Sequence, residues 1–419
     1  MKDSSLPGYL MVSEPGSFAE HTIRVRKPQI LADVLATNDY SPAVVAALGA
    51  LEREIRREPV APLPEGAWGA EHWAEALAPW RSRRWVELPW FLAETYFYRR
   101  VLEAVGYFCP GPGFLADPFA PQKRAALDEA LPALGTFLDG LPSDADDEAA
   151  TGAWLYRSLW GNRADLSNIA VQQGTRAAAD HDPAALLVDH GRDACRLFAG
   201  GRVRRLDVAC DNGGLELLSD LGLVDALLGR GLVREVRLHL KPQPYFVSDA
   251  MIPDCRETIR ALRRGADAAL RGLGERLAGY LRAGALGLRT DPFWATSHFF
   301  RRLPAGLRAE MSGADLLLLK GDVNYRRLLE DRHWPPTTRL EAVAGHMPAP
   351  FLALRTLKAE LIVGLREGEA ERLDAEDPDW RINGRRGVVH LVGEPMRGAR
   401  RGGNPASAGP ELCYNGLRT

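Results

Sequence analysis

A short apolar run near the middle of the chain ends in two polar residues and a pair of glycines. Residues 202–210 have the length and composition of a strand, Asp211 and Asn212 follow it, and Gly213 and Gly214 come next. Leucine and valine then recur at helical spacing up to residue 228. Because ligands of open α/β sheets bind beyond the carboxyl ends of the strands, we expect Asp211 and Asn212 to lie at a site. The first amide groups of the helix, just behind them, are suited to an anion.

The same alternation of strand and helix continues towards the C-terminus. Further strands are predicted at residues 233–240, 286–291, 315–319, 351–355 and 387–392, with a long helical pattern at 257–285. Strands that alternate with helices predict an α/β fold with a mainly parallel sheet and right-handed crossovers. The first half instead shows helical patterns, at 28–35, 47–57, 89–105, 122–138, 149–160 and 182–198. We therefore predict a helical N-terminal region at 20–198, an α/β domain at 199–394 and an Arg/Gly-rich tail at 395–419.

The composition excludes several classes of protein. Of the 419 residues, 46% are hydrophobic and 26% are charged, as in ordinary soluble globular proteins. The net charge of -2 gives no general attraction for nucleic acid, and no stretch reaches the ~20 apolar residues of a membrane span. The five cysteines are scattered without a CxxC pair, which favours a reducing compartment. We predict a cytoplasmic protein that binds neither nucleic acid nor membranes, and the sequence leaves its oligomeric state open.

Four groups of polar residues follow predicted strands. They are Asp211 with Asn212, Asp249, the segment 320–324 and the segment 355–358. In a parallel sheet all four would gather at one edge. Asp211, Asn212 and Asp249 offer hard oxygen ligands, which suit magnesium or manganese. The alternative for Asp211 and Asn212 is an ordinary role as helix N-caps.

Two lysines add positive charge to the same edge. Lys320 and Lys358 lie in these polar groups, and Gly321 lets backbone amides approach an anion closely. Carboxylates and lysines around one point suit a phosphate-bearing substrate, whose oxygens a cation and the lysines neutralise. For the lysines, the alternative is a solvated helix start. Asp322 is interpreted either as a catalytic residue or as the N-cap of the next helix.

The residues at these strand ends resemble the damage-control phosphatase family, and in particular its third subfamily. The matching segments are 211–217, 246–249, 291–294, 320–328 and Arg355-Thr356-Leu357-Lys358, the RTxK signature of that subfamily. The similarity covers nearly the whole chain except its ends. Gly213 stands where relatives often carry alanine, and the Arg-rich tail has no counterpart.

This resemblance implies a helical N-terminal region on a three-layer α/β/α domain, and a divalent-metal-dependent phosphatase. The implied substrates are small phosphorylated metabolites such as fructose 1-phosphate and fructose 6-phosphate. The implied metal ligands are Asp211, Asn212 and Asp249, with manganese as the first choice and magnesium, cobalt or nickel as the others. The implied substrate contacts fall on Asn212, Glu216, Lys320, Gly321, Asp322, Val323, Asn324 and Lys358.

The hypothesis from the sequence is hydrolysis of a sugar-phosphate monoester, with Asp211, Asp249, Lys320 and Asp322 as catalytic residues. Whether Asp211 attacks the phosphate or only holds the metal stays open. One alternative is an S-adenosylmethionine-dependent protein carboxyl methyltransferase, for which Gly213-Gly214 is a poor version of the expected nucleotide loop. Another is a non-catalytic protein that binds sugar phosphates without turnover.

Overall fold

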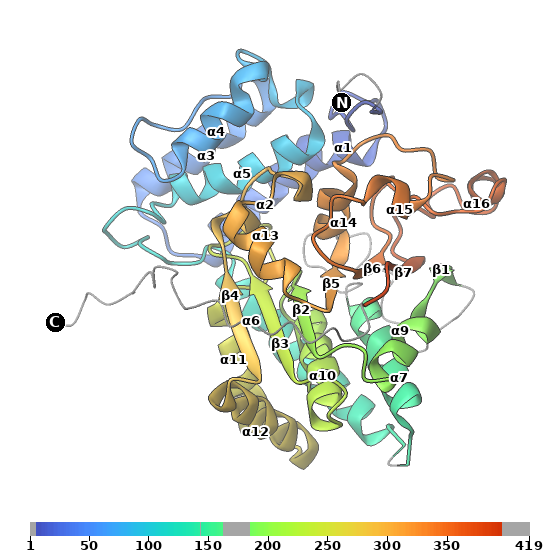
Figure 1. Ribbon diagram of the computed structural model, residues 1–419. Coiled ribbons are helices and arrows are strands. Elements are labelled where there is room, and N and C mark those ends of the chain that lie inside the picture. The colour runs from blue at the N-terminus through green and yellow to red at the C-terminus, as the bar shows by residue number, and fades with distance from the viewer. Residues whose placement is uncertain (1–5, 143, 162–184, 396–419) are drawn as a thin grey trace.

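Within the described part of the chain, seven strands form a single sheet at the centre of the protein (Figure 1). The computed structural model describes residues 6–142, 144–161 and 185–395. The strand order is β1-β7-β6-β5-β2-β3-β4. In chain order the strands are β1 (Leu186–Asp189), β2 (Arg205–Ala209), β3 (Glu235–Leu240), β4 (Leu286–Thr290), β5 (Leu316–Lys320), β6 (Phe351–Thr356) and β7 (Gly387–Val392).

The sheet is mainly parallel, as the sequence predicts. All neighbouring strands pair in parallel except β6 and β7, which are antiparallel. Because β1 pairs in parallel with β7, these two strands run opposite to the other five. The carboxyl ends of β6, β5, β2 and β3 therefore lie side by side at one edge of the sheet.

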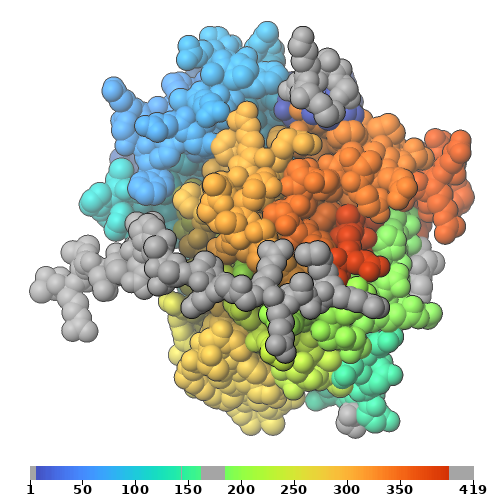
Figure 2. Space-filling view, viewed as in Figure 1, coloured from blue at the N-terminus to red at the C-terminus, as the bar shows by residue number. Residues whose placement is uncertain are grey.

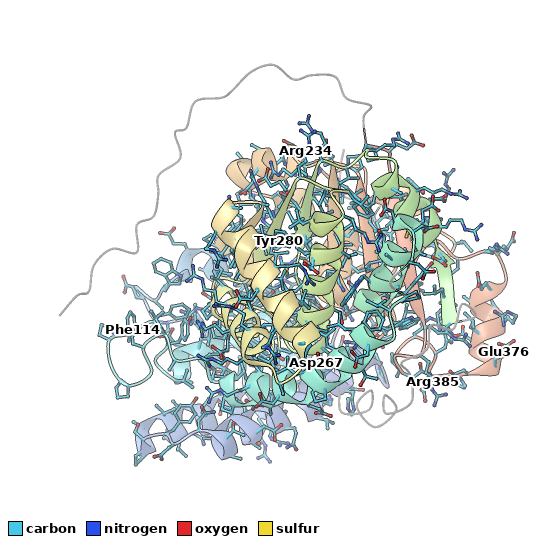
Figure 3. The ribbon with its side chains drawn as sticks, turned by 90° about the horizontal axis from the view of Figure 1, so that it is seen from below. Phe114, Arg234, Asp267, Tyr280, Glu376 and Arg385 are labelled. Atoms are coloured by element: carbon cyan, nitrogen blue, oxygen red, sulfur yellow. The ribbon has the colours of Figure 1, made fainter. Side chains whose placement is uncertain are left out.

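Helices cover both faces of the sheet and make three layers. One face carries α6 (Ala120–Asp139), α7 (Asp147–Gly161), α9 (Gly191–Ala199), α10 (Leu215–Gly229), α11 (Ile252–Arg264) and α12 (Ala268–Ala283). The other face carries α13 (Ala305–Ser312), α14 (Gly321–Leu329), α15 (Leu340–Val343) and α16 (Glu369–Glu376). In Figure 3, α12, labelled at Asp267 and Tyr280, lies beside α10 on the outside of the first face.

The central strand β5 shows why the sequence needs two helical layers. All five of its residues are buried. Leu316 and Leu318 pack into the core under α10, whereas Leu317 and Leu319 pack into the core under α13 and α14. Successive side chains of a strand point to opposite faces, so an unbroken apolar run is stable only when both faces are covered. The predicted three-layer α/β/α class is confirmed.

A separate group of helices precedes α6 and covers the carboxyl edge of the sheet. It comprises α1 (Phe18–His21), a π-helical turn η2 (Thr22–Arg26), α2 (Lys27–Thr37), α3 (Pro42–Arg57), α4 (Ala70–Leu77) and α5 (Trp90–Ala104). Its aromatic core also takes in Tyr245, Phe246 and Val323, which belong to segments that follow β3 and β5. Figures 1 and 2 show these blue helices as a continuous block above the α/β layers.

Two of the predicted elements take another form in the structure. Residues 182–198 do not form one helix, because 186–189 form the short strand β1 before α9 begins at Gly191. The helical stretch 257–285 is two helices, α11 and α12, since the chain turns between Gly265 and Asp267. The apolar run of this edge strand, residues 184–188, is too short for its periodicity to distinguish a strand from a buried helix segment, which is why its pattern merged with that of α9.

The predicted domain limits stay a prediction. Within the predicted N-terminal region, α6 and α7 pack on the sheet core, and β1 is part of the sheet itself. The predicted tail lies outside the described residues from residue 396 onwards. Among the described helices, none has the length and apolar character needed to cross a bilayer.

Candidate active site at the carboxyl edge of the sheet

The ends of four neighbouring strands supply one pocket. Asp211 and Asn212 follow β2, Asp249 lies in the loop after β3, Asp322 follows β5, and Lys358 follows β6. The side chains of all five residues line the same pocket. Their residues are far apart in sequence, and the parallel strands bring them together at a single edge, as expected for open α/β sheets.

Backbone hydrogen bonds hold the loop after β3 (residues 241–251) against the turn after β2. The Ala250 amide donates to the Asp211 carbonyl oxygen at 2.8 Å, and the Gly213 amide donates to the Ser248 carbonyl oxygen at 2.6 Å. Asn212 and Asp249 pair as an isolated antiparallel bridge. The positions of the Asp211 and Asp249 side chains are therefore set by main-chain bonds, which makes the pair rigid.

Phe246 anchors the same loop from the other side. Its φ angle of 51° lies in the left-handed region, which costs a non-glycine residue free energy. Its ring stacks on Tyr98 of α5, with the centroids 5.0 Å apart. Burial of this aromatic pair against the N-terminal helices offsets the backbone strain and holds the loop in place.

Asp211 lies among other carboxylates. It is 3% exposed, and burial, followed by the charges of Glu216 and Asp249, raises its pKa well above the ordinary value. Lys241 and Lys358 act in the opposite direction. Asp211 therefore lies in a buried site beside two other carboxylates and two lysines.

Lys241 is a buried lysine that sequence reasoning missed. It is 2% exposed and directly follows β3. Its Nζ lies 3.1 Å from Asp249 Oδ2 and donates to the Cys210 carbonyl oxygen at 2.9 Å. Its position directly after a strand is the signal that could have found it, because Asp211 and Lys358 also follow the ends of strands closely.

Asn212 links Asp211 to a second buried carboxylate. Its Nδ2 donates to Asp211 Oδ2 at 3.0 Å and to Glu216 Oε2 at 2.9 Å. Its Oδ1 accepts from the Ser248 hydroxyl at 2.6 Å. To offer its oxygen next to Asp211, the carboxamide must turn by about 180°, after which the Ser248 hydroxyl can accept from Nδ2.

Lys320 lies behind the pocket wall. It is fully buried, and its ammonium contacts Glu216 Oε1 at 3.0 Å, Asp220 Oδ1 at 3.1 Å and the Ser158 carbonyl oxygen at 2.7 Å. Burial alone would lower the pKa of Lys320, but the two carboxylates raise it above its ordinary value. These contacts fix Glu216, which in turn receives the Asn212 amide. The predicted phosphate contact of Lys320 stays a prediction.

Gly321 is required by the close approach of β5 to Asp211. Its φ angle is +77°, and a Cβ built on it would lie 1.8 Å from Asp211 Oδ2. Any side chain there would displace the carboxylate or the start of α14. Gly213, by contrast, has space for a Cβ, whose nearest neighbour would be the Ser248 carbonyl oxygen at 3.4 Å. This difference accounts for alanine being compatible with position 213.

Asp322 is held between two arginines. Its carboxylate accepts from Arg326 Nε and Arg355 Nε, both at 2.7 Å. Burial alone would raise the pKa of Asp322, but the two guanidinium groups hold it below its ordinary value. The N-cap position of α14 is Lys320, so the alternative interpretation of Asp322 as that cap is wrong.

The RTxK segment shapes the loop that presents Lys358. Arg355 is fully buried, and beyond Asp322 it donates to the carbonyl oxygens of Ala359 and Leu361. The Thr356 hydroxyl donates to the Leu159 carbonyl oxygen at 3.0 Å. The side chains of Arg355 and Thr356 therefore hold the loop in shape. Lys358, two residues after Thr356, lines the pocket.

Val323 and Asn324, both predicted as substrate contacts, lie in different surroundings. Val323 lines the pocket and packs into the core of the N-terminal helices. Asn324 is fully buried and ties α14 to β2, because its Nδ2 donates to the carbonyl oxygens of Lys320 and Ala209.

Comparison with known proteins identifies the relatives of this chain. A family model described as the damage-control phosphatase ARMT1-like domain matches residues 26–373. The chain belongs to the damage-control phosphatase family. The family protein named damage-control phosphatase ARMT1 from Danio rerio is 31% identical, with 92% of this chain and 97% of that protein covered. The Homo sapiens protein of the same name is also 31% identical, with 93% and 99% covered.

These matches confirm the family that the strand-end motifs predict, and they extend over both the helical region and the α/β layers. A solved DUF89 family protein from Pyrococcus horikoshii aligns with 89% of this chain and 98% of its own, at 13% identity and a TM-score of 0.45.

Proposed function

We propose that this protein is a divalent-metal-dependent phosphatase that hydrolyses small phosphorylated metabolites, and specifically sugar phosphates such as fructose 1-phosphate or fructose 6-phosphate. The observation that carries the proposal is the pocket itself, where the carboxylates of Asp211 and Asp249 and the ammonium-bearing Lys358 line one cavity. The relatives are named phosphatases, which supports the reaction class.

The side chains present fit a hard divalent cation. Asp211 and Asp249 supply carboxylate oxygens, Asn212 supplies a carboxamide oxygen once it turns, and the missing side chain of Gly321 leaves room at Asp211. Within the described residues, no three His, Cys, Asp or Glu side chains form a metal site by themselves. An amide and substrate oxygens would therefore complete the set, as is usual for magnesium and manganese.

Asp211, Asn212 and Asp249 would hold the cation, with manganese as the first choice and magnesium, cobalt or nickel as the others. When bound, such an ion neutralises phosphate oxygens and acts as a Lewis acid. Lys358 donates to a phosphate oxygen on the other side of the pocket. Asp322 stays ionised between its arginines and so keeps the Lys358 loop in position.

The test is release of inorganic phosphate from a panel of sugar phosphates with each of the four metals in turn. We expect turnover that a chelator abolishes, and loss of turnover in Asp249→Asn. The matched control is Asp193→Asn, which changes an exposed carboxylate on α9. Full activity in chelator, or in Asp249→Ala, would contradict the proposal.

A further inference from the structure

The pocket has a second wall, which comes from the N-terminal helices. Phe18, Arg26, Trp90 and Glu94 line the same pocket as the acidic residues of the sheet edge. None of these four residues belongs to the strand-end motifs. Two aromatic rings, one guanidinium and one carboxylate thus face the same cavity as Asp211 and Lys358.

Arg26 is a cation with no partner among the described residues. Its guanidinium makes no hydrogen bond or ion pair with any of them, its Nε is buried, and the group lies 5.5 Å from the centre of the Phe18 ring. Its neighbours on the same helix are paired, because Arg24 contacts Glu20 at 2.8 Å and Lys27 binds Glu94. A partly buried guanidinium that lacks a carboxylate is costly unless a ligand supplies acceptors.

Glu94 supplies the complementary acceptor. The residue is 1% exposed, one carboxylate oxygen binds the buried Lys27, and the other, Oε2, is buried without a hydrogen-bond partner in the described structure. Lys27 also donates to the Tyr98 hydroxyl at 3.2 Å, which fixes the ion pair in the helical core. An unsatisfied oxygen on a buried, rigidly held carboxylate needs a donor from the pocket.

A π-helical turn puts these groups on one wall. The Lys27 amide donates to the Thr22 carbonyl oxygen, five residues earlier, and the Trp90 indole donates to the Thr22 hydroxyl at 2.6 Å. The wider turn lets two successive basic residues approach α5, so that Lys27 reaches Glu94 while Arg26 faces the pocket. Turns of this kind occur frequently at functional sites.

We propose that Arg26 and Glu94 form the subsite for the organic part of the substrate and select polyhydroxylated phosphate esters. This inference rests on the proposed phosphatase function. Glu94 accepts from a hydroxyl group and Arg26 donates to a neighbouring oxygen, while the rings of Phe18 and Trp90 cover the apolar face of the sugar. A second phosphate does not suit this wall, because the Glu94 carboxylate would repel it.

The experiment compares fructose 6-phosphate with p-nitrophenyl phosphate, which has the same phosphoryl group but no hydroxyl groups. In Arg26→Met and Glu94→Gln, we expect the KM for fructose 6-phosphate to rise about tenfold with a smaller change in kcat, as for the loss of one charged hydrogen bond. The ratio of the two kcat/KM values should fall by a similar factor. Glu94→Gln keeps a hydrogen-bond acceptor for Lys27 but removes the charge that pairs with its buried ammonium, so thermal unfolding of this variant is measured beside its kinetics.

Arg24→Met is the matched control, since it removes an exposed arginine from the same π-helical turn and should leave the ratio unchanged. Equal losses for both substrates would overturn the subsite, because Arg26 would then contact the phosphoryl group. Unchanged kinetics in both variants would overturn it as well. If the wild type turns over neither ester, the proposed phosphatase function is wrong. Calorimetry with fructose 6-phosphate and Mn²⁺ then tests the subsite by itself. Weaker binding to Arg26→Met than to the wild type supports the subsite, and equal or absent binding refutes it.

Discussion

Asp211 and Asp322 are the same residue type at the ends of two neighbouring parallel strands, β2 and β5, and they line the same pocket. Their surroundings are opposite. Burial, Glu216 and Asp249 raise the pKa of Asp211, whereas Arg355 and Arg326 outweigh burial and lower the pKa of Asp322. At Asp211, burial and the neighbouring carboxylates outweigh the charges of Lys241 and Lys358, which suits an incoming cation, whereas the carboxylate of Asp322 is held by two arginines and supports the Lys358 loop. Position at a strand end marks a candidate site, and the neighbours decide the role.

The largest difference between the two aspartates should appear in catalysis. Asp211→Asn removes a proposed metal ligand, so phosphate release should fall by a factor on the order of 10³ or more. Asp322→Asn disturbs only the support of the Lys358 loop, so a loss of up to about a hundredfold is expected. Initial rates with saturating Mn²⁺ measure both. If Asp322→Asn proves the more damaging of the two, the assigned roles are reversed.

In the presence of a chelator, substitutions of the two aspartates should have different effects on the free energy of unfolding. Asp322→Ala leaves the buried guanidinium of Arg355 without its carboxylate, and breaking such a pair costs about 3 kcal/mol or more. Asp211→Asn removes one of several mutually repelling carboxylates and should leave the free energy of unfolding unchanged or raise it. Urea unfolding monitored by tryptophan fluorescence gives both values. A clear loss of stability in Asp211→Asn would show that its carboxylate is already compensated.

The glycine after each strand offers a narrower comparison. Gly321→Ala places a Cβ against Asp211 and at a positive φ angle, so we expect a loss of about 1–2 kcal/mol from backbone strain and weaker metal binding. Gly213→Ala should be nearly neutral, because its Cβ meets only the Ser248 carbonyl oxygen at 3.4 Å. Mn²⁺ titration and thermal unfolding of both variants test this. Equal Mn²⁺ affinity and equal thermal stability of the two variants would mean that Gly321 is farther from Asp211 in solution.

The smallest expected effect is on pH dependence. The folded pKa of Asp322 is lower than its unfolded value, so its contribution to stability is complete above about pH 4 and is lost as the pH falls further. The stability difference between wild type and Asp322→Asn should therefore shrink below about pH 4. The folded pKa of Asp211 is raised, so in chelator its ionisation cost grows as the pH rises above about 4. Urea unfolding of the wild type and of the Asn variants of Asp211 and Asp322 at several pH values measures both effects. The same pH trend for both variants would contradict the difference between the two environments.

Much of this arrangement could be predicted from the sequence. Apolar runs that end in polar residues identify β2, β5 and β6, and the topology of parallel sheets then brings Asp211, Asp322 and Lys358 to one edge. The direction in which a long side chain turns is not encoded in such a pattern. Lys320 stands at the end of β5, yet its four-carbon side chain runs back to Glu216 and Asp220, behind the pocket.

Contributions from the N-terminal helices were less predictable. The segment around Trp90 reads as core packing, and most of its residues are indeed buried. Glu94 is part of the same helix, and only its unsatisfied oxygen distinguishes it from a structural carboxylate. Arg26 depends on the π-helical turn, which has no sequence signature that distinguishes it from an ordinary helix. The antiparallel pairing of β7 with β6 likewise depends on the path of the connecting segment, residues 357–386.

Tyr245, Phe246 and Val323 are inserted into the aromatic core of the first hundred residues. The loops of the α/β half that line the pocket therefore depend on packing against the helical half. A chimera of two distant relatives would therefore have to take both halves from the same parent. A recombination point between the halves would pair each loop residue with a helical core of different side chains, and contacts between neighbouring residues are not additive.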